Sequence, residues 1–159
     1  MARALKTRNR RRGMTMVELV VSFTILITLT GMAVPLNRVK VRVNKERDLV
    51  NALREMHTAI DKYHEYANLG YLGPQKPGTN GWPETLDILV EGVKLPGPEG
   101  KKMRFLRKIP TDPFTGNTDW GLRSDQDDPK GQTWGGQDVF QVYTKTTEKG
   151  ANGIPYAEW

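Results

Sequence analysis

The architecture of this chain is decided by the stretch GMTMVEL at residues 13–19. It joins a basic run that ends at Arg12 to residues 14–36, in which Glu18 is the only charged residue. A lone carboxylate inside a membrane span costs roughly 2.5–3.5 kcal/mol on insertion scales. Because a plain anchor has no use for that cost, we expect Glu18 to have a specific partner for its charge.

Residues 14–36 predict a transmembrane helix. These 23 residues would extend about 34 Å as an α-helix, which exceeds the roughly 30 Å hydrocarbon core of a bilayer. Basic residues flank both ends, six within residues 1–13 and five within residues 38–47, so the positive-inside rule does not set the orientation.

Two residues weaken this helix near its outer end. Pro35 removes the hydrogen bond to the carbonyl of Gly31 and crowds that carbonyl, which costs about 3 kcal/mol in a regular helix. With Thr24 and Thr28 they form a stripe of small residues. The stripe has two interpretations that the sequence leaves open: close approach of a second helix, or hydroxyl groups that bind carbonyls of their own helix.

The N-terminal pattern resembles that of type IV prepilins and of the pseudopilins of type II secretion systems. It comprises a basic leader, Gly13, an apolar residue after it, and an acid five residues past the glycine; Met14 stands where Phe is usual. The resemblance implies that a prepilin peptidase cleaves between Gly13 and Met14 and that the new terminus at Met14 is N-methylated. It also implies that Glu18 guides assembly of a homopolymeric filament and that the helix breaks at Gly31 and Pro35 when subunits pack.

The resemblance further implies a place in the cell and a set of partners. The chain would cross the bacterial inner membrane once, with its head in the periplasm. Besides the membrane and other copies of itself, its partners would be the prepilin peptidase, an inner-membrane assembly platform and minor pseudopilins. No nucleic-acid partner is expected.

The sequence leaves four other interpretations of the N-terminus open. A simple signal anchor would explain the apolar run, and a secretory signal peptide could be cut at residues 31–33, although Glu18 argues against both. Within the resembling family, the rival is a major or minor pilin of a type IV pilus. From another class, the rival is a periplasmic binding domain or enzyme that uses residues 14–36 only as a tether.

The net charge of +6 does not indicate a nucleic-acid partner. Six of the 24 basic residues lie in residues 1–13, and the remaining 18 balance the 18 acidic residues. The basicity therefore belongs to the leader, residues 1–13, that the resemblance implies is removed. There is no cysteine, so no disulfide stabilises the head.

Residues 37–69 predict an amphipathic continuation of the helix. Its apolar residues recur every three or four positions: Leu49, Leu53, Met56, Ile60, Tyr63 and Ala67. Packing on its own head is favoured over a coiled coil, because the stripe covers fewer than three heptads. Residues 38–43 alternate like a strand, but the helical pattern on both sides favours helix, and Gly70 supplies a stop.

Residues 70–159 predict a small α+β head with one short helix and an antiparallel sheet. Pro83 is suited to open the helix, and residues 101–108 suggest a further helical turn. The inward residues of the helix that begins at Pro83 would be Leu86, Leu89, Val90 and Val93. Strands are expected at residues 120–124 and 139–144, with Phe140 and Val142 on one face, and the terminal aromatics are expected to pack back on the sheet.

A second match narrows the resemblance. The stretch FLRKIPTDPFTG at residues 105–116 is similar to the segment before the sheet in major pseudopilins, and its Asp-Pro and Gly predict a turn. Such proteins often bind calcium in the loop after the last strand. Here that loop, residues 145–152, has no Asp, so Asp125, Asp127 and Asp128 are weaker metal candidates, and no other cofactor is expected.

The sequence shows no sign of an enzyme. It lacks cysteine and has two histidines, His57 and His64, which lie about 10.5 Å apart along one predicted helix, too far to share a metal ion. There is no glycine-rich phosphate loop. We therefore expect a structural role.

Overall fold

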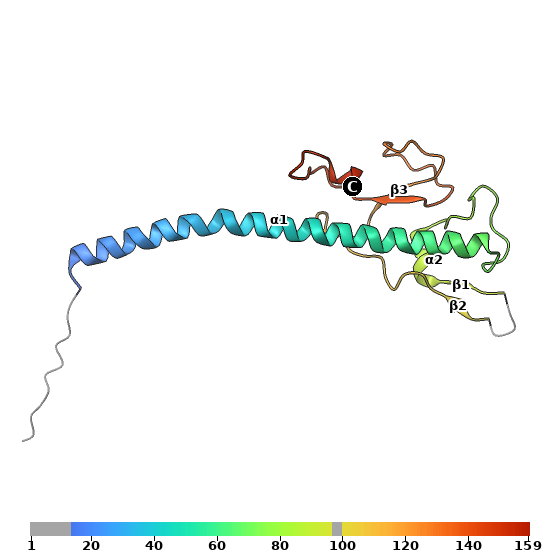
Figure 1. Cartoon of the computed structure of the whole chain (residues 1–159), viewed down its shortest axis with the longest axis horizontal. Helices are drawn as coiled ribbons and strands as arrows, with labels where there is room; N and C mark the ends of the chain where they lie inside the picture. Colours follow the sequence, from blue (N-terminus) through green and yellow to red (C-terminus); the bar gives the residue numbers. More distant parts are fainter. Residues whose placement is uncertain (1–13, 97–99) are drawn as a thin grey trace, which may run out of the picture. The chain divides into compact units, whose positions relative to one another are not determined.

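The computed structural model describes residues 14–96 and 100–159, but not the side chains of residues 31–38. The chain divides into two compact units, one up to Arg42 and one from Val43 to Trp159. The elements are α1 (Met16–Asn68), α2 (Leu86–Glu91), β1 (Val93–Lys94), β2 (Lys102–Met103), β3 (Gly121–Arg123), β4 (Gln141–Tyr143) and the 3-10 helix η1 (Tyr156–Glu158) (Figure 1). The expected α+β class, a long N-terminal helix with a small antiparallel head, is confirmed.

The part of α1 in the first unit displays its apolar side chains. The large apolar residues between Met16 and Leu29 are 45–86% exposed. The hydroxyl groups of Thr24 and Thr28, the two threonines of the small-residue stripe, each donate to a carbonyl four residues earlier, at 2.8 and 2.6 Å. Of the two interpretations of the small-residue stripe, the isolated chain therefore shows hydroxyl groups bonded to their own helix. No helix within the described residues combines the length and apolar character that a membrane span needs.

In the second unit, α1 supplies about half of the hydrophobic core. Every residue of the predicted stripe is buried, and Ala52 and Ala59 extend it. The stripe packs in one cluster with residues from the rest of the head, namely Leu72, Leu86, Leu89, Leu106, Trp120, Val139, Val142 and Tyr156. The expectation that the stripe packs on the chain's own head is therefore confirmed, as is the helical state of residues 38–43.

The C-terminus of α1 is closed by a Schellman motif. Gly70 adopts φ 75°, its N–H donates to Ala67 O at 2.9 Å, and the Tyr71 N–H donates to Tyr66 O at 3.0 Å. This pair of bonds satisfies carbonyls that the helix end would otherwise leave unpaired. The rings of Tyr66 and Tyr71 lie 5.8 Å apart and supply the apolar contact that accompanies the motif.

The region after α1 departs from prediction in two places. Helix α2 starts at Leu86 with Thr85 as N-cap, and not at Pro83. Residues 101–108 form no helical turn: Lys102–Met103 is strand β2, which pairs antiparallel with β1. Each strand has two residues, too few for an alternating pattern to show in the sequence.

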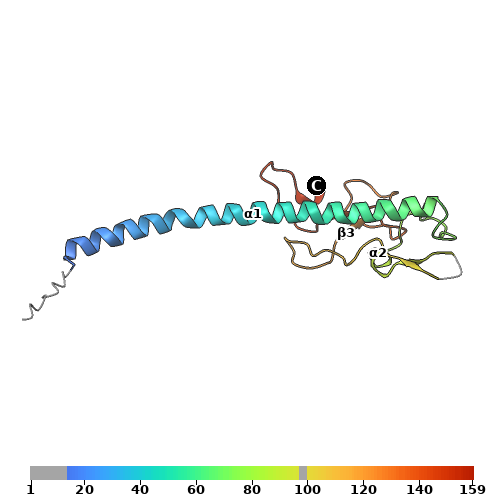
Figure 2. The same cartoon turned by 60° about the horizontal axis from the view of Figure 1, so that its bottom comes forward.

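Strands β3 and β4 form a second antiparallel pair, with Leu122 opposite Val142. The head thus holds two separate two-stranded sheets. They lie on different sides of α1 in the view of Figure 1, whereas in the turned view of Figure 2 the labels of α2 and β3 fall on the same side of the helix. Val142 is fully buried, whereas Phe140 is 44% exposed and precedes β4, so the two do not share a buried face. This corrects the predicted pairing of faces.

The C-terminal aromatics pack back on the head, as expected. Tyr156 is fully buried and its ring centroid lies 4.4 Å from that of Phe114 and 4.8 Å from that of Trp159. Its hydroxyl donates to Glu46 Oε1 on α1 at 2.6 Å. Helix η1 also contacts β4, so the end of the chain is fixed to both α1 and the sheet.

Candidate functional site

The beginning of α1 is capped by its own side chain. Thr15 Oγ1 accepts a hydrogen bond from the Glu18 N–H at 3.3 Å, and Thr15 O accepts one from the Leu19 N–H at 3.1 Å. Thr15 and Glu18 therefore occupy the N-cap and N3 positions of a Thr-x-x-Glu capping signature. Sequence reasoning missed this role of Thr15, although the spacing was readable in residues 15–18.

The Glu18 carboxylate is exposed and lies in the first turn of α1. An acid there is favoured by the helix dipole by about 0.3–1 kcal/mol. Within residues 14–96 and 100–159, no hydrogen bond or ion pair involves this carboxylate. It is thus available to a positive group from outside the chain.

The structure describes some of the other predicted N-terminal site residues but not all of them. Met14 is 68% exposed and precedes α1. Gly13 lies outside the described residues. Gly31 and Pro35 lie within the bounds of α1, where their backbone is helical. A break at these two residues stays a prediction for the assembled state.

The acidic loop after β3 uses its carboxylates to hold its own backbone. Asp127 Oδ2 accepts the N–H groups of Ser124 at 2.8 Å and Gly135 at 3.0 Å, and these bonds lower the pKa of Asp127. Asp128 Oδ1 accepts the Lys130 N–H at 2.9 Å. These bonds fix the loop in shape.

Asp125 points elsewhere, and its Oδ2 accepts a hydrogen bond from Asn80 Nδ2 at 2.8 Å. Among the residues that the structure describes, no three His, Cys, Asp or Glu side chains converge in a way that could hold a metal ion. The carboxylates of the loop are therefore arranged as in a self-bonded turn.

The burial of two acids, Asp138 and Asp112, was not predicted from the sequence. Asp138 is fully buried and accepts the Ser124 hydroxyl on Oδ2 at 2.8 Å; burial, its main influence, raises the pKa of Asp138. Asp112 is also fully buried, and its Oδ2 accepts the Thr144 hydroxyl at 2.5 Å. Both acids bond to segments distant in sequence, so they fasten loops to the sheet of β3 and β4.

The two histidines of α1 make structural contacts. His57 Nε2 lies 3.5 Å from the backbone nitrogen of Val142, a long hydrogen bond to β4. The His64 ring stacks on Trp82 with centroids 3.7 Å apart, and its Nε2 lies 2.9 Å from Asn68 Nδ2. Each ring thus joins α1 to the head.

Comparison with known proteins addresses only the N-terminal region. Residues 8–34 match the family model of the prokaryotic N-terminal methylation motif. No curated protein and no solved structure matches the chain. The match supports a membrane-anchored subunit of the type IV pilin-like class, which in general is processed by a prepilin peptidase and assembles into filaments, and whose role is structural.

Proposed function

We propose that this chain is a structural subunit of a type II secretion pseudopilus. It is cleaved between Gly13 and Met14, N-methylated at Met14, and held in the bacterial inner membrane by residues 14–36. Its periplasmic head, residues 70–159, is joined through residues 37–69, and growth of the filament drives protein export. The methylation motif at residues 8–34 carries the pilin-like part of the proposal, and the resemblance of residues 105–116 to major pseudopilins favours the pseudopilus.

The exposed apolar side chains of α1 support this assignment. Between Met16 and Leu29 they point to all sides of the helix and none is buried. In water this surface would be strongly unfavourable, at about 25 cal/mol per Å² of apolar area. A bilayer before assembly and neighbouring helices after assembly both remove it from water.

In this proposal, Glu18 sets the axial register between neighbouring subunits of the filament. In lipid its carboxylate needs a positive partner, and the processed terminus at Met14 of a neighbouring subunit carries a positive amine. Pairing the two neutralises the acid and sets the axial position of each incoming subunit. The Glu18 carboxylate is exposed and has no ion-pair partner among the residues that the structure describes, which is consistent with such a partner.

The experiment replaces Glu18 by Gln in the full chain and compares it with Glu65→Gln, an exposed acid of the same helix. Intact mass spectrometry establishes cleavage and methylation, and electron microscopy and secretion assays measure assembly. We expect both variants to be processed and only Glu18→Gln to lose filaments. Normal filaments from processed Glu18→Gln protein would refute the role of this charge.

Two observations separate the alternatives. A tethered binding domain or enzyme would keep residues 1–13, so a mature mass that starts at Met14 argues against it. A type IV pilus subunit would form surface filaments without promoting export, whereas the segment at residues 105–116 favours the pseudopilus. Loss of secretion on deletion of the gene, without loss of surface pili, is the expected result.

A further inference from the structure

A groove of about 450 Å³ lies between α1 and the segment that follows β2. Its lining includes three cationic side chains, Arg54, Lys62 and Arg107, and one acid, Glu55. Arg54 and Lys62 lie eight residues apart on α1, so they occupy roughly one face of the helix. Within the described part of the chain, none of the three cations forms an ion pair with an acid.

Positive charge continues from this groove along the adjoining hairpin. Residues 94–108 contain six basic residues and one acid. Lys94, Lys102, Arg104 and Lys108 are exposed there. We call this surface, together with Arg54, Lys62 and Arg107, the basic groove. It would attract an anionic partner and would be screened by salt, because exposed charges are shielded beyond about 8–10 Å at physiological ionic strength.

The same unit carries the opposite charge on the loop after β3. Asp125, Asp127 and Asp128 fall within four residues, and Asp125 and Asp128 are exposed. The hydrogen bonds that hold the loop use one oxygen of each carboxylate, Oδ2 of Asp125 and Asp127 and Oδ1 of Asp128. The loop is thus an anionic projection that its own hydrogen bonds hold in shape.

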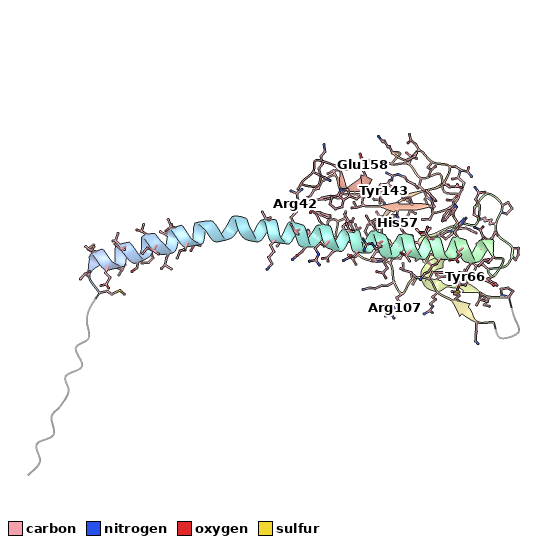
Figure 3. All side chains as sticks on the ribbon, in the orientation of Figure 1. Arg42, His57, Tyr66, Arg107, Tyr143 and Glu158 are labelled. Atoms are coloured by element: carbon pink, nitrogen blue, oxygen red, sulfur yellow. The ribbon has the colours of Figure 1, made fainter. Side chains whose placement is uncertain are left out.

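These two surfaces lie on different sides of α1. Figure 3 shows Arg107 on one side of the helix and Tyr143, which belongs to the β3–β4 pair, on the other. Figure 1 shows the β1–β2 hairpin and β3 separated by α1 in the same way. In this view the groove and the sheet that precedes the acidic loop thus lie on different sides of the helix. Two complementary surfaces on different faces are the requirement for a heterologous contact, which repeats without closing.

We propose that the acidic loop at residues 125–128 of one copy docks in the basic groove of the next copy. The inference rests on the proposed filament and adds a contact between heads to the contact made by the N-terminal helices. Because single exposed ion pairs contribute little, the contact needs several pairs at once, which the three acids and the cations of the groove provide. It would fix the rotational order of neighbouring heads.

The absence of cysteine from the sequence makes a crosslinking test direct. Full-length chains carrying Lys62→Cys and Asp128→Cys together are assembled in the membrane and oxidised. We expect a ladder of disulfide-linked oligomers from the double variant, and only dimers from a mixture of the two single variants. The matched control carries Asp48→Cys together with Asp128→Cys. Asp48 is exposed and lies about 21 Å from Lys62 along the same helix, so this variant should give no ladder.

Charge reversal supplies the second test. Lys62→Glu with Arg107→Glu should reduce filament number about tenfold or more, because like charges then face each other, and adding Asp125→Lys with Asp128→Lys should restore assembly. If the groove instead binds anionic lipid or an acidic exported protein, the acidic reversal will restore nothing, and the inference is overturned.

The outcomes also separate this inference from the proposed function. Filaments that form normally but yield no ladder refute the contact between heads and leave the subunit assignment intact. Processed wild-type chains that form no filaments refute the subunit assignment itself. The double-cysteine chain carrying Glu18→Gln should give no ladder, which shows that the crosslinks arise in assembled filaments.

Discussion

The ring of Tyr143 occupies the space that a side chain at Gly121 would need. The two residues are partners in the β3–β4 register, and a Cβ atom built on Gly121 would lie 2.3 Å from Tyr143 Cζ. The Arg123 guanidinium also lies over this ring, 4.1 Å from its centroid. Tyr143 is thus held against β3, and its hydroxyl donates to Gln132 O at 3.2 Å in the loop that follows.

Gly121→Ala should therefore destabilise the head. Overpacking of this kind costs about 1–3 kcal/mol, because the added methyl group displaces the ring. Urea unfolding of the full chain in detergent measures the loss. In the double variant with Tyr143→Ala, the cost of Gly121→Ala should largely disappear. Strictly additive effects would show that the ring does not set the requirement for glycine.

Gly70→Ala should weaken the C-terminal cap of α1. The residue has φ 75°, and nothing lies within 4 Å of an added Cβ, so the cost comes from the backbone alone. We expect a loss of about 1–2 kcal/mol in the free energy of unfolding. Gly70→Asn is the matched control and should lose less, because Asn tolerates this conformation. Equal losses from Ala and Asn would contradict the assignment.

Asp138 and Asp127 should affect stability with opposite dependence on pH. The pKa of Asp138 is raised above 3.8 by burial, so the free energy of unfolding falls as pH rises from 3.8 through the raised pKa. The pKa of Asp127 is lowered, so its contribution is complete above 3.8 and is lost as pH falls through the lowered pKa.

Two variants measure these contributions. Asp138→Asn should remove the fall in stability above pH 3.8, and Asp127→Asn should remove the loss on the acid side. Denaturant unfolding between pH 2.5 and 8 at about 0.1 M salt gives both profiles. Parallel profiles for the wild type and both variants would exclude these groups as sources of pH dependence.

Thr15→Val should loosen the first turn of α1. Loss of an N-cap side chain costs about 0.5–2 kcal/mol, so amide exchange at Glu18 should accelerate by about fivefold. Thr15→Ser keeps the hydroxyl and is the control. We expect Thr15→Val to retain more assembly than Glu18→Gln, because capping is a smaller contribution than charge pairing. Equal loss of filaments would mean that Glu18 acts mainly through the cap.

In assembled subunits, the helix should be interrupted near Gly31 and Pro35. Proline removes one backbone hydrogen bond and clashes with the preceding turn, so this is the weakest point of α1. A filament map should show non-helical backbone here, and Pro35→Ala should shorten or remove the interruption. A map with regular helix through residues 28–38 would refute this prediction.

Helix α1 was predictable because its signals are local. The buried stripe from Leu49 to Ala67 repeats at helical spacing, and Gly70 marks the end, so both the face and the stop follow from the sequence. Residues 38–43 alternate like a strand, yet the helical pattern on both sides correctly outweighed that local preference. The helical pattern was the better guide because it extends over many more residues than the six that alternate.

The head was less predictable because its features depend on distant partners. Strands β1 and β2 have two residues each and are stabilised by their pairing, so residues 101–108 suggested a helical turn when the sequence was taken alone. No local pattern marks Asp112 or Asp138 as buried. Each buried carboxylate accepts a hydrogen bond from a distant hydroxyl group, that of Thr144, 32 residues from Asp112, and that of Ser124, 14 residues from Asp138. A local sequence pattern cannot predict such a partner.

The core stripe of α1 also has a consequence for biosynthesis. Met56 leaves the ribosome early, but Val142, which packs in the same cluster, follows 86 residues later. At about 5–20 residues per second, the apolar face of α1 remains uncovered for roughly 4–17 s. During that interval it is open to unintended partners, so the nascent subunit should depend on chaperones or on rapid delivery to the membrane until its last strand has been made.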